Sequence, residues 1–171
     1  SMPVMIARPD LAVTMLDSLQ KRLTFLEEVS RQLELDCTFI HARAEDGGRE
    51  KKLRERFDFA TARAVAHLRE LAEYCLPYVK VGGYFVALKG PGAQEEIAES
   101  KNAIATMGGK VEKVMQFCLP ENSTRTIVVI RKISPGPLPK WQKNRYYKSN
   151  QEQKGRKVTN DSAGKQAYSV L

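Results

Sequence analysis

Residues 57–90, FDFATARAVAHLRELAEYCLPYVKVGGYFVALKG, decide the fold. Two apolar runs, Phe57–Ala62 and Tyr84–Leu88, do not alternate with polar residues, which is typical of strands covered on both faces in a parallel sheet. Between them, apolar residues at steps of three and four predict one buried helix face; they are Val65, Leu68, Leu71, Ala72, Cys75, Leu76 and Val79. Gly82-Gly83 is expected to end the helical unit. The stretch predicts a strand–helix–strand unit of an open α/β sheet.

The flanking sequence predicts more elements of the same kind. Strands are expected at Leu11–Leu16, Cys37–Ile40, Val111–Leu119 and Thr126–Arg131, and a helix at Pro91–Met107. Ser18 is expected to cap another helix, whose buried stripe would be Leu19, Leu23, Leu26, Val29 and Leu33. The last two strands are separated by Pro120–Arg125, a loop of hairpin length, so the sheet is expected to close in a β-hairpin.

Composition narrows the class of protein. The chain has 171 residues, of which 42% are hydrophobic and 28% charged, as expected for one globular domain. No apolar run approaches the roughly 20 residues of a membrane span, and no signal peptide is visible. The three cysteines form no CxxC pair, which favours reduced packing residues in a cytoplasmic protein and no metal site.

Charge is distributed unevenly along the chain. Residues 1–130 hold 18 basic and 18 acidic residues, so residues 131–171 carry the whole net charge of +8. This segment has no periodic apolar face, so residues 1–133 are predicted to form the folded domain and residues 134–171 a basic, disordered tail. Its Trp141, Tyr146 and Tyr147 suit base stacking beside phosphate contacts on RNA. A solvated tail without a partner is an equally good interpretation.

Charged residues follow the predicted strands. Asp17 at a strand end can accept hydrogen bonds from both ribose hydroxyls of an adenosine cofactor, although an acid there more often serves a turn or a cap. Ala44-Glu45 follows the next strand and could frame an adenine. Arg63 must reach water, a carboxylate or a ligand, because an unpaired buried charge is costly, and Lys89 holds the equivalent place one strand later. His41 and His67 are isolated and indicate no metal site.

At these residues the chain resembles a known family, the bacterial 16S ribosomal RNA guanine-N7 methyltransferases (RsmG, or glucose-inhibited division protein B). The order of strands and helices closing in a hairpin is also that of α/β methyltransferases. The matching segments are collinear and cover about 130 residues. They are IARPDL (6–11), LDSLQKRLTFLEEV (16–29), HARAED (41–46), FDFATARAVAHL (57–68), LAEYCLPYVKVGGYFVALKG (71–90), MGGKVE (107–112) and TIVVIRK (126–132).

The resemblance implies a Rossmann-like fold, S-adenosylmethionine as methyl donor, and guanine-527 in the 530 loop of the small-subunit rRNA as target. It implies cofactor contacts at Ala44, Glu45 and Arg63, and Asp17 matches the acid that closes the second strand. Asp17 and the neighbouring Ser18 are therefore also expected to bind the cofactor. The RNA backbone would be contacted by Lys89 and by tail residues Lys140, Lys143 and Arg145, and the partner would be 16S rRNA or the small ribosomal subunit. No catalytic base is assigned.

The chain also departs from the family pattern. An N-terminal helical region, the first strand and its glycine-rich loop are expected to be missing, so the fold is predicted to be truncated. The two strands flanking the missing one must then pair with each other, with another chain, or with something unexpected. The tail or a segment swapped from a second copy could fill the missing position. The alternative function is therefore an inactive α/β fragment of this family that binds RNA only through its basic tail.

Overall fold

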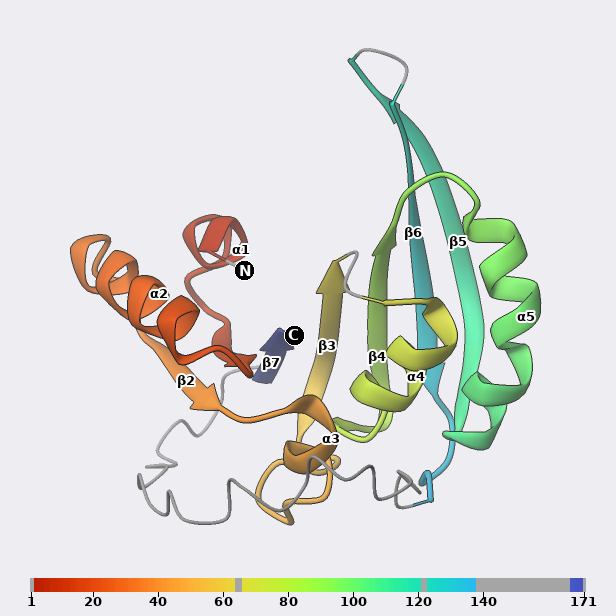
Figure 1. Cartoon of the computed structure of the whole chain (residues 1–171), viewed down its shortest axis with the longest axis horizontal. Coiled ribbons are helices and arrows are strands. Elements are labelled where there is room, and N and C mark those ends of the chain that lie inside the picture. The colour runs from red at the N-terminus through yellow and green to blue at the C-terminus, as the bar shows by residue number, and fades with distance from the viewer. Residues whose placement is uncertain (1, 64–65, 121–122, 138–166, 171) are drawn as a thin grey trace.

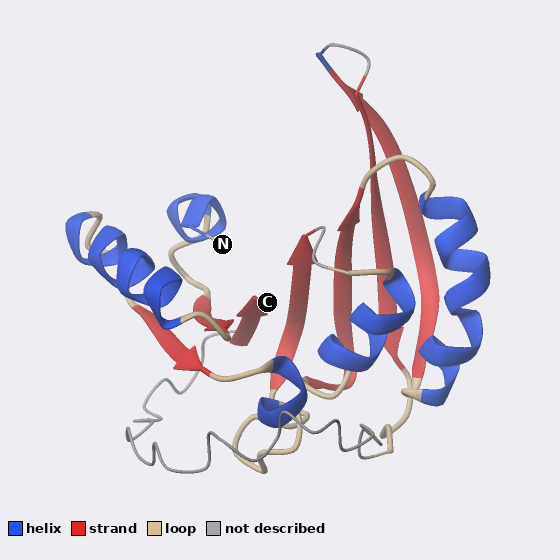
Figure 2. Cartoon of the chain, viewed as in Figure 1, coloured by secondary structure: helices blue, strands red, loops and turns tan. Residues whose placement is uncertain are grey.

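The computed structural model describes residues 2–63, 66–120, 123–137 and 167–170. They form one α/β unit built on a twisted sheet (Figures 1 and 2). The helices are α1 (Met2–Ala7), α2 (Gln20–Gln32), α3 (Ala44–Gly47), α4 (Leu68–Cys75) and α5 (Ala93–Thr106). The strands are β1 (Ala12–Asp17), β2 (Cys37–His41), β3 (Phe57–Arg63), β4 (Val79–Lys89), β5 (Gly109–Leu119), β6 (Ser123–Lys132) and β7 (Ala167–Val170).

The sheet confirms the predicted architecture. Its strand order is β2-β1-β7-β3-β4-β6-β5. The pairs from β2 to β4 are all parallel, whereas β6 is antiparallel to both β4 and β5, so the sheet closes in the expected hairpin. The connection from β3 through α4 to the adjacent parallel β4 is the strand–helix–strand unit predicted from residues 57–90.

The centre of the sheet is completed by the tail. Strand β7 lies between β1 and β3 and is parallel to both (Figure 1). The structure pairs β1 and β3 with the tail of the same chain, one of the possibilities that the sequence left open. The expectation of a disordered tail is therefore wrong for residues 167–170, because two unpaired strand edges offer them backbone partners. Residues 138–166 lie outside the described part of the chain.

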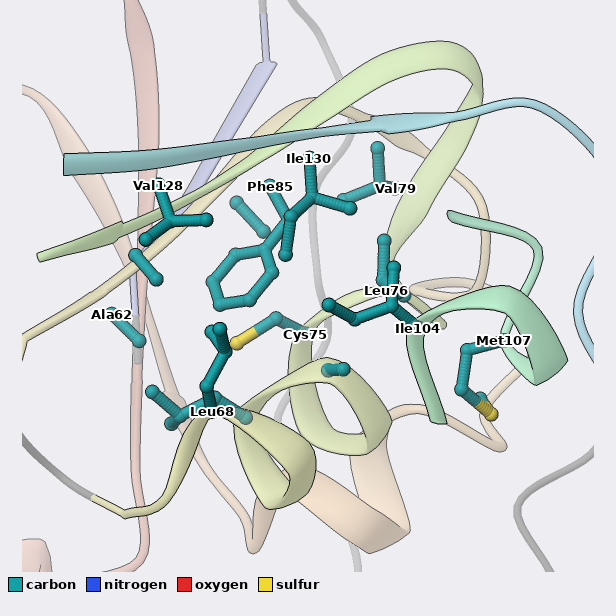
Figure 3. Packing of buried hydrophobic residues seen from close by; sticks show 14 of the residues in the cluster. Ala62, Leu68, Cys75, Leu76, Val79, Phe85, Ile104, Met107, Val128 and Ile130 are labelled. Carbon is teal, nitrogen blue, oxygen red and sulfur yellow. The ribbon is translucent and has the colours of Figure 1, made fainter. Parts of the chain in front are cut away.

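Apolar side chains cover both faces of the sheet. On one face, α4 and α5 pack on β3, β4 and β6, where Phe85 and Ile130 point toward Cys75 and Ile104 (Figure 3). On β1, Met15 packs with residues of α1 and α2, whereas the next residue, Leu16, packs with Tyr78. Successive residues of a strand point to opposite faces, so α1 and α2 cover the other face beside β1 and β2.

The predicted helix of the central unit is shorter than its apolar pattern. Helix α4 covers Leu68–Cys75, and its stripe is buried as expected. Val79 already belongs to β4, and Val65 lies outside the described residues. In α2, Leu23 is buried, but Leu19 and Leu33 are about half exposed, so the predicted stripe is wrong at both ends of that helix.

Gly82-Gly83 does not end the helical unit, as the sequence predicted, but lies inside β4. Phe57 pairs with Val79, whereas Phe59 pairs with Tyr84, so the register shifts at this point. Gly82 has φ of 90°, and a Cβ on Gly83 would lie 2.5 Å from the Asp58 carbonyl oxygen. The two glycines are needed for this irregularity between β3 and β4. At the surface beside this irregularity, an ion pair joins Lys80 of β4 to Asp58 of β3.

Strands β5 and β6 form a long hairpin arm (Figure 1). Pairing of β4 with β6 ends at Lys89 and Thr126, whereas pairing of β5 with β6 continues to Leu119 and Ser123. The predicted Pro120–Arg125 loop is shorter than expected, because Ser123 already begins β6. Among the described helices, none has the length and apolar character needed to cross a bilayer.

A buried ammonium group fastens the end of β6. Lys132 is fully buried, and its Nζ donates to the carbonyl oxygens of Met107 at 2.8 Å and Leu76 at 3.1 Å. Glu55 lies 3.7 Å from the same nitrogen. Burial lowers the pKa of Lys132 to about 8, although the Glu55 carboxylate raises it. Arg54 donates to the Gly136 carbonyl, so this cluster also fixes the start of the tail.

The depressed pKa of Lys132 predicts a stability that rises with pH. Between pH about 8 and 10.5 the unfolded chain binds a proton that the folded chain releases, so the free energy of unfolding should increase. Urea unfolding at pH 7.5, 8.5 and 9.5 should show this rise in the wild type. The Lys132→Met variant, which cannot titrate there, should show a flatter profile. Parallel profiles for the two chains would contradict the assignment.

Candidate functional site

The carboxyl ends of five parallel strands meet at one edge of the sheet. Met15 and Thr61 both pair with Val170 of β7, so these three residues stand at one level. Asp17 and Arg63 each lie two residues further along and therefore also share a level. Two inter-strand spacings separate them, or about 10 Å between their Cα atoms. The structure thus brings two predicted site residues to the same edge of the sheet, at the ends of the two strands that flank β7.

Asp17 has a structural task at the end of β1. Its Oδ1 accepts a hydrogen bond from the Leu19 amide at 2.8 Å, and its Oδ2 lies 3.2 Å from Arg22. The predicted cap is therefore wrong: the Ser18 hydroxyl does not cap α2, whose N-terminus has no side-chain cap, and the Asp17 carboxylate binds the amide of Leu19, the residue that precedes the helix. A carboxylate has about four acceptor positions, so Asp17 keeps acceptor capacity beyond these two contacts.

The segment after β2 lies beside Asp17 and Ser18. The Ala42 amide donates to the Asp17 carbonyl at 3.2 Å, and His41 Nε2 lies 3.0 Å from the Ser18 carbonyl oxygen. These backbone contacts bring the second predicted pair, Ala44-Glu45, to the first turn of α3 on the same side of the sheet centre. Asp17, Ser18, Ala44 and Glu45 therefore form one neighbourhood.

Tyr78 holds the Ala44 part of this neighbourhood in place. Its hydroxyl donates to the Ala44 carbonyl at 2.7 Å, and its ring is fully buried with Leu16 and Phe57. Burial, and after it the nearby Cys75, Glu45 and Asp46, raise the pKa of the Tyr78 phenol above its usual range, so it remains a donor. Sequence reasoning missed Tyr78, because it precedes β4 and no local pattern connects it with residue 44.

Arg63 lies on the other side of β7 from Asp17. It is the last residue of β3 and is exposed, so its guanidinium reaches water, one of the three options that the sequence allowed. Among the described residues, the structure records no ion pair between Arg63 and either Asp17 or Glu45. Arg63 is thus at the predicted edge, but apart from the Asp17 neighbourhood.

Lys89 is placed differently from the expectation of an RNA contact. Its side chain is 8% exposed, with Nζ 2.7 Å from Glu96 Oε2 and 2.9 Å from the Ala66 carbonyl oxygen. An ammonium group engaged in this way would have to leave its ion pair to reach a phosphate. The geometry therefore favours a structural role for Lys89, which holds the segment after β3 against β4.

Glu96 connects three elements at this edge. The oxygen that meets Lys89 also accepts from the Leu68 amide at 2.9 Å, so one carboxylate on α5 serves both β4 and the start of α4. Burial raises its pKa, but the hydrogen bonds from Lys89 and Leu68 outweigh this effect and hold the pKa of Glu96 below its ordinary value. The sequence explained Glu96 only by its place in a first helical turn.

The remaining predicted residues cannot be placed. Lys140, Lys143 and Arg145 lie outside the described residues, so their role stays a prediction. Within the part of the chain that is described, no group of three or more His, Cys, Asp or Glu side chains is arranged to hold a metal ion.

Glu96→Gln should destabilise the chain by about 2 kcal/mol at pH 7, because Lys89 would keep a buried charge without a counter-charge. The lowered pKa of Glu96 means that this stabilisation is present above pH 4.5 and is lost as the pH falls through the folded-state value. Chemical denaturation at pH 7 and pH 3 should therefore show a gap from wild type that narrows in acid. Glu95→Gln, on the same helical turn and exposed, is the matched control; a gap independent of pH would contradict the ion pair.

Sequence comparison places the chain beside curated relatives. It is 54% identical over 139 residues to the ribosomal RNA small subunit methyltransferase G of Lactobacillus johnsonii, a match that covers 80% of this chain and 58% of the relative. The protein of the same name from an Exiguobacterium species is 52% identical over 144 residues, covering 82% of this chain and 60% of the relative. The chain thus spans about 60% of the length of these relatives.

Solved structures share its fold at low sequence identity. A 16S rRNA (adenine(1408)-N(1))-methyltransferase mutant from Catenulisporales acidiphilia has a TM-score of 0.59 at 14% identity, with 79% of each chain covered. A methyltransferase from Pyrococcus furiosus also has a TM-score of 0.59 at 14% identity, covering 78% of this chain and 70% of the other. These similarities support the predicted Rossmann-like methyltransferase fold.

The family model described as rRNA small subunit methyltransferase G, GidB, matches residues 1–128. The matched range includes Asp17, Ala44-Glu45 and Arg63. Together with about 50% identity to relatives of that name, it shows that the chain belongs to the rRNA small subunit methyltransferase G (GidB) family.

Proposed function

We propose that the chain is part of an S-adenosylmethionine-dependent methyltransferase that acts on guanine N7 in 16S rRNA, at guanine-527 of the 530 loop. With such a substrate, we expect the protein to act in the cytoplasm. The observation that carries the proposal is the common level of Asp17 and Arg63 at the ends of the two strands that flank β7. Family membership supplies the reaction class.

This edge of the sheet has the topology of a ligand site. From β1 the chain continues outward to β2, and from β3 it continues the other way to β4. Ligands of open α/β sheets bind outside the carboxyl ends of the strands where the direction of winding reverses. The site proposed for the cofactor therefore lies between the end of β1 and the end of β3.

The residues present fit a cofactor made of a nucleoside and an amino acid. The Asp17 carboxylate would accept hydrogen bonds from ribose hydroxyls, and Ala44-Glu45 would lie along the base. Arg63, at the end of β3, would pair with the carboxylate of the amino-acid end, because a guanidinium can donate two parallel hydrogen bonds to it. Tyr78 would act indirectly, since it fixes the Ala44 carbonyl.

The chemistry requires alignment more than acid–base help. When bound, S-adenosylmethionine supplies an electrophilic methyl group. N7 of guanine carries a lone pair and no hydrogen, so no side chain has to remove a proton before attack. The contribution of this chain is to hold the donor in place at the sheet edge, which is a proximity effect. The base has to be reached in single-stranded or loosened RNA.

The RNA would be held by the basic segment. Residues 131–171 carry ten basic and two acidic residues, and Lys140, Lys143 and Arg145 lie in its first half. Phosphate contacts supply most of the sequence-independent affinity for a nucleic acid. The second candidate function, an inactive member of the family that binds RNA only through this segment, rests on the same charge.

Binding of the cofactor separates the two functions. Isothermal titration of the full chain with S-adenosylmethionine should give saturable binding, and Arg63→Ala should weaken it about tenfold, which corresponds to about 1.4 kcal/mol. Arg69→Ala, an exposed arginine at the start of α4, is the control and should bind like wild type. No heat of binding at millimolar cofactor, with RNA binding retained, would favour the inactive alternative.

RNA binding should depend on salt through the tail. When Lys140, Lys143 and Arg145 are all replaced by glutamine, the slope of log K against log salt for a small-subunit rRNA fragment should become shallower by about 2 to 3. Lys101→Gln, which replaces an exposed lysine of α5, should leave the slope unchanged. An unchanged slope in the triple variant, measured by fluorescence anisotropy from 50 to 300 mM salt, would remove the tail from the RNA interface.

A further inference from the structure

Strand β7 joins two strands that do not pair with each other. It is in register with β1 over Ala167–Val170 and with β3 over Tyr168–Val170. In the described sheet β1 and β3 have no other partner on these inner edges, because the order runs β1-β7-β3. A few residues of backbone therefore complete the middle of the sheet.

The space that β7 fills has the width of one strand. Two inter-strand spacings, about 10 Å, separate β1 from β3. With β7 out, both inner edges would present rows of unpaired amide and carbonyl groups, which are costly to leave unsatisfied. A parallel, extended segment satisfies both edges at once, whereas a helix or a loop does not. The chemistry of the space thus selects a strand as its occupant.

The walls of this space are held together by residues of other elements. Leu16 of β1 and Phe57 of β3 pack in one cluster with Leu53 and Tyr78. The Tyr78 hydroxyl adds its hydrogen bond to the Ala44 carbonyl. These contacts connect the β1–β2 half of the sheet with the β3–β4 half independently of residues 167–170. The two halves of the sheet therefore have contacts with each other besides those made through β7.

The occupant comes from a remote part of the chain. Strand β6 lies on the far side of β4, and residues 133–166 connect it with β7. The entropic cost of closing a loop rises only slowly with its length. A connection of this length therefore does not require that the strand come from the same chain. The same segment of a neighbouring molecule meets the same two edges, as in exchanges of identical elements between protomers.

We propose that the space between β1 and β3 is a strand-acceptor site for the segment around residues 167–170. It binds this segment as a parallel strand through backbone hydrogen bonds to both walls. The segment is supplied here by the chain itself, and a second copy of the chain can supply it in the same way. The acceptor site recognises an extended backbone.

The first test opens the site in the full chain. Ser169→Pro removes one backbone donor and imposes a φ unsuited to a parallel strand, whereas Ser169→Ala keeps both. Hydrogen exchange at Thr14 and Ala60, the partners of residue 169, should accelerate at least tenfold in the proline variant only, with Val86 and Val128 unchanged. A synthetic peptide of residues 165–171 should then restore slow exchange. The wild-type chain should not bind the peptide.

The second test needs no proline and serves if that variant fails to fold. A chain with Thr14→Cys is mixed with a chain carrying Ser169→Cys, both with the exposed Cys118 replaced by serine, and the mixture is refolded together at high concentration. A short bis-maleimide should crosslink them into a mixed dimer. The matched control is a partner chain with Lys101→Cys, at an exposed position of α5, which should give only background crosslinking.

Two results would overturn the proposal. One is equal exchange at Thr14 and Ala60 in the wild-type and Ser169→Pro chains, or exchange in the variant that the peptide leaves unchanged. The other, where the proline variant is unfolded, is a mixed dimer no more abundant than with the Lys101→Cys partner.

Discussion

Backbone hydrogen bonding at the centre of the sheet is the constraint on which the rest of the structure depends. Strand β7 gives β1 and β3 their shared neighbour and fixes the level of one against the other. Because Asp17 ends β1 and Arg63 ends β3, the register of four residues from the tail also sets the geometry of the candidate site. A slip of one position would move Asp17 relative to Arg63 and turn side chains to the other face.

The sequence predicted those parts of the fold that short-range periodicity determines. The run from Phe57 to Gly90 predicts two buried strands and a helix. A strand buried on both faces and a helix buried along one stripe have different patterns of apolar residues. The irregularity at Gly82-Gly83 was misread, since a glycine pair marks both a turn and a bulge. Strand β7 could not be located from its own residues, because its partners, not its composition, make it a strand.

The candidate site, like the fold, was predicted only in part from the sequence. Strand ends are visible in a sequence, so Asp17, Arg63 and Lys89 were rightly expected at one edge. The partners of these side chains were not, because they come from elsewhere in the chain: Glu96 of α5 neutralises Lys89, and Tyr78 supports Ala44. Residue spacing carries no information about contacts between remote elements, and the buried state of Lys89 followed only from the packed structure.

The order in which the sheet is completed has a consequence for how the chain folds during synthesis. Among the strands described, the one at the middle of the sheet is translated last. Each half of the sheet can pack around its hydrophobic cluster while the chain is still being translated. The inner edges of β1 and β3 stay unpaired until residues 167–170 leave the ribosome. Such a contact has a large sequence separation and therefore forms slowly. Nascent chains that carry open strand edges are exposed to association with one another.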